Sequence, residues 1–294
     1  MKATVLIDNN TKKNLIPEWG LSILIEYNGH KILLDAGASD SFADNAETLG
    51  IDLADVEFAV LSHAHYDHAN GMAKFFEKNQ TAPFYIGSGS AENCYHSFGP
   101  EAKYIGMPQG ILKDYHERII FAEEVHEVIP GVRLIGHRKE FLAEQGVNLS
   151  EIGKKADMYV CEDNAGAGCC CESCGCGEAE AVWRPDSFDH EQSLVFETEK
   201  GLVIFNSCCH GGADNVVMEV ADLYPDQKIY AIIGGFHLYE TPDDEVEAFG
   251  KRLAETGVEK VVTGHCTGDR GCEILAEVLG DRLELLYTGK VMEF

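Results

Sequence analysis

Four side chains that can bind metal ions stand within six residues, at His63, His65, Asp67 and His68. In an extended loop His63 and His65 point the same way, and a turn after them directs Asp67 and His68 to a second position nearby. Imidazole and carboxylate groups bind divalent ions, and the two ions of a dinuclear site lie about 3.5–4 Å apart. The spacing therefore predicts a dinuclear metal site rather than a solvated histidine-rich loop.

The surrounding pattern predicts the elements that position these side chains. An apolar run at 56–61 predicts a strand that leads directly into the motif, and 70–78 has helical spacing. Further histidines follow predicted strands in the second half of the chain, at His210, His237 and His265. Each half therefore begins with strands and ends with strand–loop–helix units.

The domain organisation follows from the lack of a linker rich in Pro or Ser between the halves. We expect one domain over 1–294, with a Cys-rich insertion or loop at about 161–180. Two mixed sheets face to face with helices outside, an α/β (α+β) four-layer αββα sandwich, fit two similar layers better than a doubly wound sheet.

The histidine motif resembles the His-x-His-x-Asp-His signature of the metallo-β-lactamase superfamily, and later motifs extend the resemblance over nearly the whole chain. It implies the αββα sandwich with the metal ions at one edge. It also implies that His63 and His65 hold one ion and that Asp67 and His68 hold the other. Asp35, in Leu-Leu-Asp-Ala-Gly, matches an early aspartate that supports the histidine loop by hydrogen bonding.

The same resemblance suggests the remaining ligands. His190 stands where the third histidine of the first site is expected, with Asp189 as a competitor. His265 would complete the second site. The family's bridging aspartate is missing, and Cys208 stands nearest to its position, with His210 as the rival ligand.

Three later motifs, Ser-Cys-Cys-His-Gly-Gly, Gly-Gly-Phe-His-Leu and Gly-His-Cys-Thr-Gly, are similar to the branch of dihydropterin-linked ribofuranosylaminobenzene-phosphate synthases. That branch implies condensation of a pterin diphosphate with a ribosylated aromatic amine. His210 and His237 would then bind anions or transfer protons, and Asp67 would orient water as well as bind metal.

The leading expectation is a dinuclear metal-dependent hydrolase that attacks a small phosphorylated or ester substrate with a metal-bound hydroxide. A transferase of the synthase type, using the same site, is the alternative. A non-catalytic metal or redox sensor that uses the Cys-rich loop is a further one. The expected cofactors are two divalent ions, zinc first, with iron or manganese as alternatives.

The chain has 11 cysteines, and five of them crowd into 169–176. An odd count in a chain without a visible signal peptide favours reduced thiols or metal ligands over a disulfide framework. Cys171 and Cys174 offer a Cys-x-x-Cys pair for structural zinc or an iron–sulfur cluster, and a thiol-rich loop near the mouth of the site is the other interpretation.

The charge balance limits the partners. Lys and Arg number 23 against 50 Asp and Glu, a formal net charge of −27, which repels nucleic-acid backbones and anionic lipid surfaces. No run of about 18 apolar residues is present. We expect a soluble, cytoplasmic protein with a small-molecule substrate and no nucleic-acid or membrane partner, and the sequence leaves a homo-oligomer open.

Overall fold

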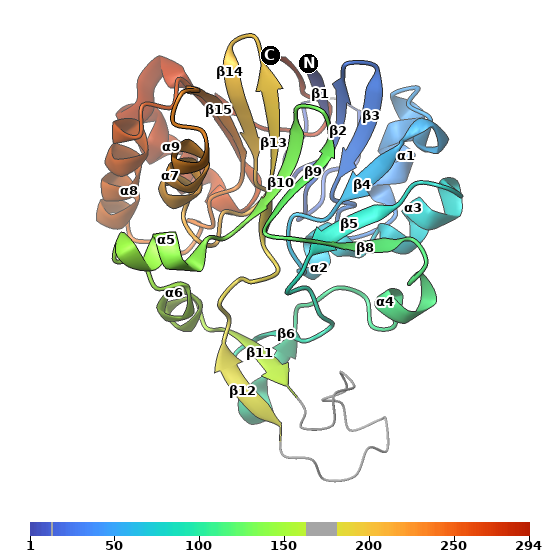
Figure 1. Cartoon of the computed structure of the whole chain (residues 1–294), viewed down its shortest axis with the longest axis horizontal. Coiled ribbons are helices and arrows are strands. Elements are labelled where there is room, and N and C mark those ends of the chain that lie inside the picture. Colours follow the sequence, from blue (N-terminus) through green and yellow to red (C-terminus); the bar gives the residue numbers. More distant parts are fainter. Residues whose placement is uncertain (13, 163–180) are drawn as a thin grey trace.

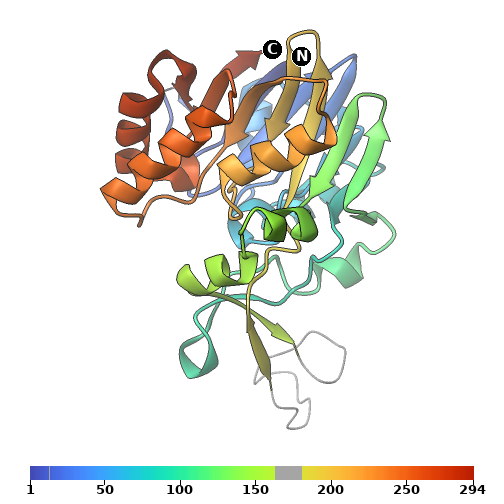
Figure 2. The same ribbon diagram turned by 60° about the vertical axis from the view of Figure 1, so that its left-hand side comes forward.

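Two seven-stranded sheets pack face to face, and helices cover the outer face of each in the computed structural model (Figure 1, Figure 2). The structure describes residues 1–12, 14–162 and 181–294. A smaller, four-stranded sheet extends from one edge of the sandwich. The predicted Cys-rich insertion, including Cys171 and Cys174, lies outside the described residues except at its ends.

The three sheets have the following strands in spatial order. The first contains β18 (Val291–Glu293), β1 (Lys2–Ile7), β2 (Ser22–Tyr27), β3 (His30–Leu34), β4 (Phe58–Val60), β5 (Phe84–Gly87) and β8 (Ile119–Ala122). The second contains β17 (Leu283–Leu285), β16 (Lys260–Thr263), β15 (Ile229–Gly234), β14 (Gly201–Phe205), β13 (Gln192–Thr198), β10 (Val132–Gly136) and β9 (Val125–Ile129). The small sheet contains β12 (Val182–Pro185), β11 (Met158–Glu162), β6 (Cys94–His96) and β7 (Lys103–Tyr104).

The helices fall into groups by the sheet that they cover. On the first sheet lie α1 (Ser41–Thr48) and α3 (Met72–Lys78), preceded by the short α2 (Tyr66–Ala69). On the second lie α7 (Ala213–Leu223), α8 (Asp243–Glu255) and α9 (Gly268–Leu279). The remaining helices are α4 (Ile111–Asp114), α5 (Lys139–Glu144) and α6 (Leu149–Lys155).

The alternation of apolar side chains along each central strand explains the four layers. In β2, Ile23 and Ile25 face the core between the sheets, whereas Leu24 packs in the core under α1 and α3. In β13, Phe196 faces the core between the sheets and Val195 faces the core under the second group of helices. Because both faces of each sheet bury apolar side chains, each sheet needs a covering layer on both sides. The αββα sandwich expected from the sequence is confirmed.

Strands β3, β4, β5 and β8 run parallel in the first sheet, and β14 to β17 run parallel in the second. The loops that leave the carboxyl ends of these strands carry the histidine motif in one sheet and the later histidines in the other. The small sheet lies below this edge in Figure 1. It was not predicted, because its strands are short and carry no sustained alternation of apolar and polar residues.

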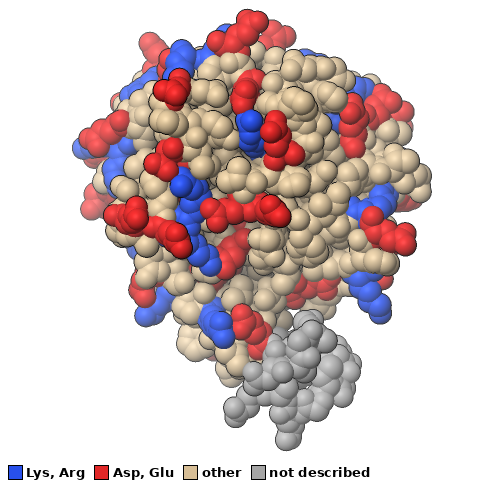
Figure 3. Space-filling view, in the orientation of Figure 1, with Lys and Arg blue, Asp and Glu red and all other residues tan. Residues whose placement is uncertain are grey.

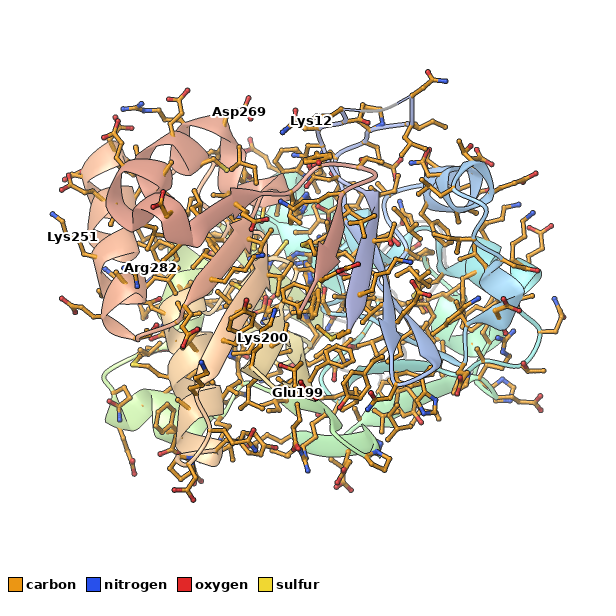
Figure 4. The ribbon with its side chains drawn as sticks, turned by 90° about the horizontal axis from the view of Figure 1, so that it is seen from above. Lys12, Glu199, Lys200, Lys251, Asp269 and Arg282 are labelled. Carbon is orange, nitrogen blue, oxygen red and sulfur yellow. The ribbon has the colours of Figure 1, made fainter. Side chains whose placement is uncertain are left out.

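Charged side chains of both signs are spread over the face of the molecule that Figure 3 shows. Acidic side chains lie among basic ones across the face shown in Figure 3, without one patch of a single sign. Lys251 of α8 points outward from the helical layer, and Glu199 and Lys200 mark the turn between β13 and β14 (Figure 4). No helix within 1–12, 14–162 or 181–294 is long and apolar enough to cross a bilayer.

Candidate metal centre

The histidine motif forms a tight turn at the end of β4. His65 is the last residue with extended backbone, and α2 begins immediately after it at Tyr66. The turn directs His63 and His65 to one position, and Asp67 and His68, which lie within α2, to another. The division of the four ligands between two positions stays a prediction, and the helix begins inside the motif rather than after it.

Three imidazoles meet at the first position. Ligand atoms of His63, His65 and His210 lie within 4.8 Å of one another. The Nε2 atom of each is buried without a hydrogen-bond partner within the described part of the chain. A buried polar nitrogen without a partner is costly, and three of them aimed at one point are the arrangement that a metal ion satisfies.

Burial keeps these imidazoles in the form that binds metal. It lowers the pKa of His63 and His210 well below the usual value, and the neighbouring histidines add to this effect. Burial also lowers the pKa of His65, to about 3. The rings are therefore neutral at pH 7, as metal ligands must be.

The second position combines a carboxylate with two imidazoles. His68 Nε2 lies 3.2 Å from His265 Nε2, and Asp67 Oδ2 lies 3.7 Å and 3.5 Å from these two atoms. Burial raises the pKa of Asp67, but His68 and His265 outweigh it and hold the pKa well below the usual range. For His265 the effect of burial has the opposite sign and lowers the pKa, but the charges of Cys266 and Asp67 outweigh it and raise the pKa to about 9. A cation at this position would replace the proton of His265.

A series of hydrogen bonds from Asp35 orients the rings of His63 and His68. Asp35 accepts hydrogen bonds from the Ser62 amide at 2.7 Å, the Ser62 hydroxyl at 2.7 Å and His68 Nδ1 at 2.8 Å. His63 Nδ1 donates to the Ser62 hydroxyl at 2.9 Å. Fixing Nδ1 of both rings leaves each Nε2 to face the site, which is how outer carboxylates orient metal-binding histidines. The role expected for Asp35 is thus present.

Cys208 lies between the two positions. Its sulfur is 3.3 Å from His68 Nε2, and its ligand atom clusters both with His63 and His68 and with His265 and Cys266. This is where the missing bridging aspartate was expected. His210, the rival for that place, instead joins His63 and His65.

A buried ionic network holds His210 in place. Glu191 accepts the amide hydrogens of His210 at 2.9 Å and Gly211 at 3.3 Å. Its carboxylate also contacts His137 Nε2 at 2.6 Å, and His137 Nδ1 contacts Glu219 at 3.0 Å. None of these three charged groups was identified from the sequence, because nothing in their spacing indicates that they meet.

His190 has a different environment from the one expected. Its Nδ1 accepts the Ala64 amide hydrogen at 3.2 Å, and its Nε2 donates to Asp186 at 3.0 Å. Both ring nitrogens are therefore engaged, and its ligand atom clusters with His65, Cys94 and Asp186. Asp189, the competitor, instead pairs with Lys139 at 2.5 Å. In this structure His210 has the free nitrogen that the third histidine of the first position requires.

The two positions open into a cavity of about 360 Å³, and His237 lies on its wall. The Nδ1 atom of His237 is buried without a hydrogen-bond partner in the described residues, and its ring lies 4.4 Å from that of His210. Trp19 lines the cavity and packs on His265, and Lys103 of the small sheet lines it from the other side. A second hollow of about 570 Å³ shares His210, His237 and Tyr239 with it.

Four non-glycine residues at the site have left-handed backbone. They are Asp35, Cys209, His237 and His265, with φ between 47° and 57°. This conformation costs about 1–2 kcal/mol for a residue with a Cβ. Such strain collects where a side chain must point in a direction that regular backbone does not provide.

Comparisons with known proteins show which family this chain is similar to. The model of the metallo-beta-lactamase superfamily matches residues 18–146. A synthase from Methanocaldococcus jannaschii is 28% identical over 294 residues, covering 95% of this chain and 92% of its own length. Its name is 7,8-dihydropterin-6-methyl-4-(beta-D-ribofuranosyl)-aminobenzene-5'-phosphate synthase.

Solved structures show the same fold. A metal-dependent hydrolase of the beta-lactamase superfamily is 28% identical, with a TM-score of 0.78, and the match covers 100% of this chain and 99% of that one. The Zn²⁺-bound PqqB from Methylobacterium extorquens is 12% identical, with a TM-score of 0.53 and 100% of each chain covered. At 12% identity, the likeness to PqqB shows a shared fold alone.

Proposed function

We propose that this chain, which belongs to the metallo-β-lactamase superfamily, uses two divalent ions to hydrolyse a small phosphorylated or ester substrate. The fold is that of a metal-dependent enzyme. The proposal depends chiefly on one observation, the three unpartnered Nε2 atoms of His63, His65 and His210 beside a second cluster of ligands.

The residues fit two ions. His63, His65 and His210 would hold the first, and Asp67, His68 and His265 the second, with Cys208 between them. His210 thus replaces His190 in the first set. When bound, such ions lower the pKa of water at the site and polarise the oxygen under attack. Zinc suits this mixture of nitrogen, oxygen and sulfur ligands best.

The protein's own groups would then orient the reactants. Asp67 is ionised and can accept a hydrogen bond from attacking water. His237 faces the cavity with an unpartnered nitrogen and is the group that we expect to give a proton to the leaving group. Lys103 on the cavity wall supplies a positive charge for an anionic substrate in a chain that is otherwise strongly acidic.

Transfer is the second candidate, and two observations favour it. One relative, whose match covers 95% of the chain, is named as a synthase. In addition, the cavity above the ligands continues into a second hollow lined by Phe188, Phe236 and Phe249, which offers room for an aromatic second substrate. The same ions would activate a diphosphate leaving group, and an amine would replace water.

One experiment separates the two reactions. Zinc-loaded protein is incubated with a dihydropterin-methyl diphosphate, with and without a ribosylated aminobenzene phosphate, and diphosphate release is measured. A hydrolase releases diphosphate in either case, whereas a transferase releases it only with the amine and forms a carbon–nitrogen bond. A panel of nitrophenyl phosphate mono- and diesters extends the test to other substrates. His63→Ala is the control, and equal turnover by this variant would contradict metal-dependent catalysis.

A further inference from the structure

A second free thiol lies beside Cys208 at the metal centre. Cys266 follows His265 in the short turn after β16, and Cys208 follows β14 in the same sheet. Both are free cysteines and almost fully buried, with 1% and 2% of their surface exposed. Their sulfurs are 3.4 Å apart, with Cys266 Sγ donating a hydrogen bond to Cys208 Sγ, and this distance is far too long for a disulfide bond.

The pair lies among the ligands of the second position. Ligand atoms of Cys208, His265 and Cys266 are within 4.8 Å of one another, and His265 forms an equally compact group with Asp67 and His68. The two groups share His265, and together they contain two sulfurs, two imidazoles and one carboxylate.

The backbone around Cys266 favours a thiolate there. The His237 amide donates a hydrogen bond to the Cys266 sulfur at 3.2 Å. Cys209, the neighbour of Cys208, differs in this respect, because its sulfur donates to the Asn206 carbonyl at 3.4 Å and packs with the apolar core under α7. Cys208 and Cys209 are adjacent in the loop after β14, yet Cys208 faces the metal centre and Cys209 faces the core.

We propose that Cys266 is a second sulfur ligand of the second metal position, in addition to Cys208. Two thiolates make that position selective for thiophilic ions such as Zn²⁺, Co²⁺ and Cd²⁺ over Mn²⁺ and Mg²⁺, whereas the all-imidazole first position discriminates less. Each thiol gives its proton to solvent as the ion binds, and no oxidation or reduction takes place. The inference rests on the proposed dinuclear site and deepens it.

The test uses Co²⁺ as the probe, added anaerobically to the metal-free full-length chain. Bound cobalt is counted by mass spectrometry, and sulfur ligation is measured from the thiolate-to-cobalt absorption in the near ultraviolet. Cys266→Ser should lose about half of this absorption and bind the second ion at least tenfold more weakly. Cys208→Ser should show a similar loss. Cys209→Ser, a buried cysteine one residue away, is the matched control and should match the unsubstituted chain.

The outcomes distinguish the two proposals. Two bound cobalt ions with undiminished absorption in Cys266→Ser would overturn the role of Cys266 and leave the dinuclear site intact. Failure of the unsubstituted chain to bind cobalt would overturn both. X-ray absorption of the zinc-loaded, unsubstituted chain needs no variant to fold. Because the signal averages over two zinc ions, it should show about one sulfur per zinc at about 2.3 Å, and a fit to about half a sulfur per zinc or none would also refute the inference.

Discussion

His137 offers a sharp test of the buried network that holds the metal-binding loop. It lies between Glu191 and Glu219, and the side chains of all three are no more than 4% exposed. Burial lowers the pKa of His137, but the two carboxylates outweigh it and raise the pKa from 6.5 to about 10. The imidazole is therefore charged at neutral pH and completes an ionic group with two buried negative charges.

The rise in the pKa of His137 gives the size and the sign of its contribution to the free energy of unfolding. Each pKa unit corresponds to about 1.4 kcal/mol, so a change from 6.5 to about 10 contributes at most ~5 kcal/mol to the free energy of unfolding. The folded chain holds a proton that the unfolded chain releases between these values. The stabilisation is therefore complete below pH 6.5, decreases as the pH rises, and is lost above about pH 10.

Glu219→Gln removes one carboxylate charge and keeps a hydrogen-bond acceptor in its place. We expect the pKa of His137 to fall by about 1–3 units, since an opposite charge at this distance shifts a pKa by that amount. The free energy of unfolding at pH 7 should fall by about 1.5–3 kcal/mol, the value of a hydrogen bond to a charged group. The loss of stability with rising pH should also finish at a lower pH than in the unsubstituted chain.

The measurements are an NMR titration of the His137 ring and urea unfolding from pH 6 to 10. Glu57→Gln is the matched control, because Glu57 pairs with His30 at 2.8 Å on the exposed surface. That substitution should change the free energy of unfolding by less than about 1 kcal/mol. If the His137 ring of the unsubstituted chain titrates near pH 6.5, or if both substitutions have the same effect, the account of a charged buried histidine is wrong.

Three further predictions concern the ligands and the core. His210→Ala should lose one bound metal ion per chain, whereas His190→Gln should retain both, and the reverse result, measured by mass spectrometry, would restore His190 as the ligand. Asp35→Asn should weaken metal binding about 10–100-fold, because the carboxylate orients His68 and the Ser62–His63 pair. A competition titration with a chromophoric chelator measures the affinity. Phe196→Ala should lower the free energy of unfolding by about 3–5 kcal/mol, since the ring is fully buried between the sheets. Urea unfolding measures this loss, and a loss of less than about 1 kcal/mol would mean that the core collapses around the gap.

The strong local patterns predicted much of this structure. The strand expected at 56–61 corresponds to β4 and the helix expected at 70–78 to α3, because the apolar residues of both pack in the core. The His-x-His-x-Asp-His motif could be divided between two positions because all four ligands lie in one turn. Residues that are close in the chain have few relative placements, so the sequence restricts them strongly.

Contacts between distant segments were harder to predict. His190 and His210 stand on either side of the β13–β14 hairpin, and their order along the chain favoured His190. The left-handed backbone of Cys209, and the hydrogen bonds that the His210 and Gly211 amides donate to Glu191, bring the His210 ring to the site. Cys266 was overlooked because its neighbour His265 matched the family motif, and only the packing of two loops shows that its sulfur meets Cys208.

The left-handed residues at the site have a consequence for attempts to make the chain more robust. Glycine at Asp35, Cys209, His237 or His265 would relieve the backbone and is the kind of exchange that a search for thermostable variants selects. At Asp35 and His265 it would also delete a side chain that orients or forms the metal centre. We therefore expect turnover to fall at these two positions, and at Asp35 heat tolerance should fall as well because three buried hydrogen bonds are lost. Cys209 can be exchanged with little loss of turnover.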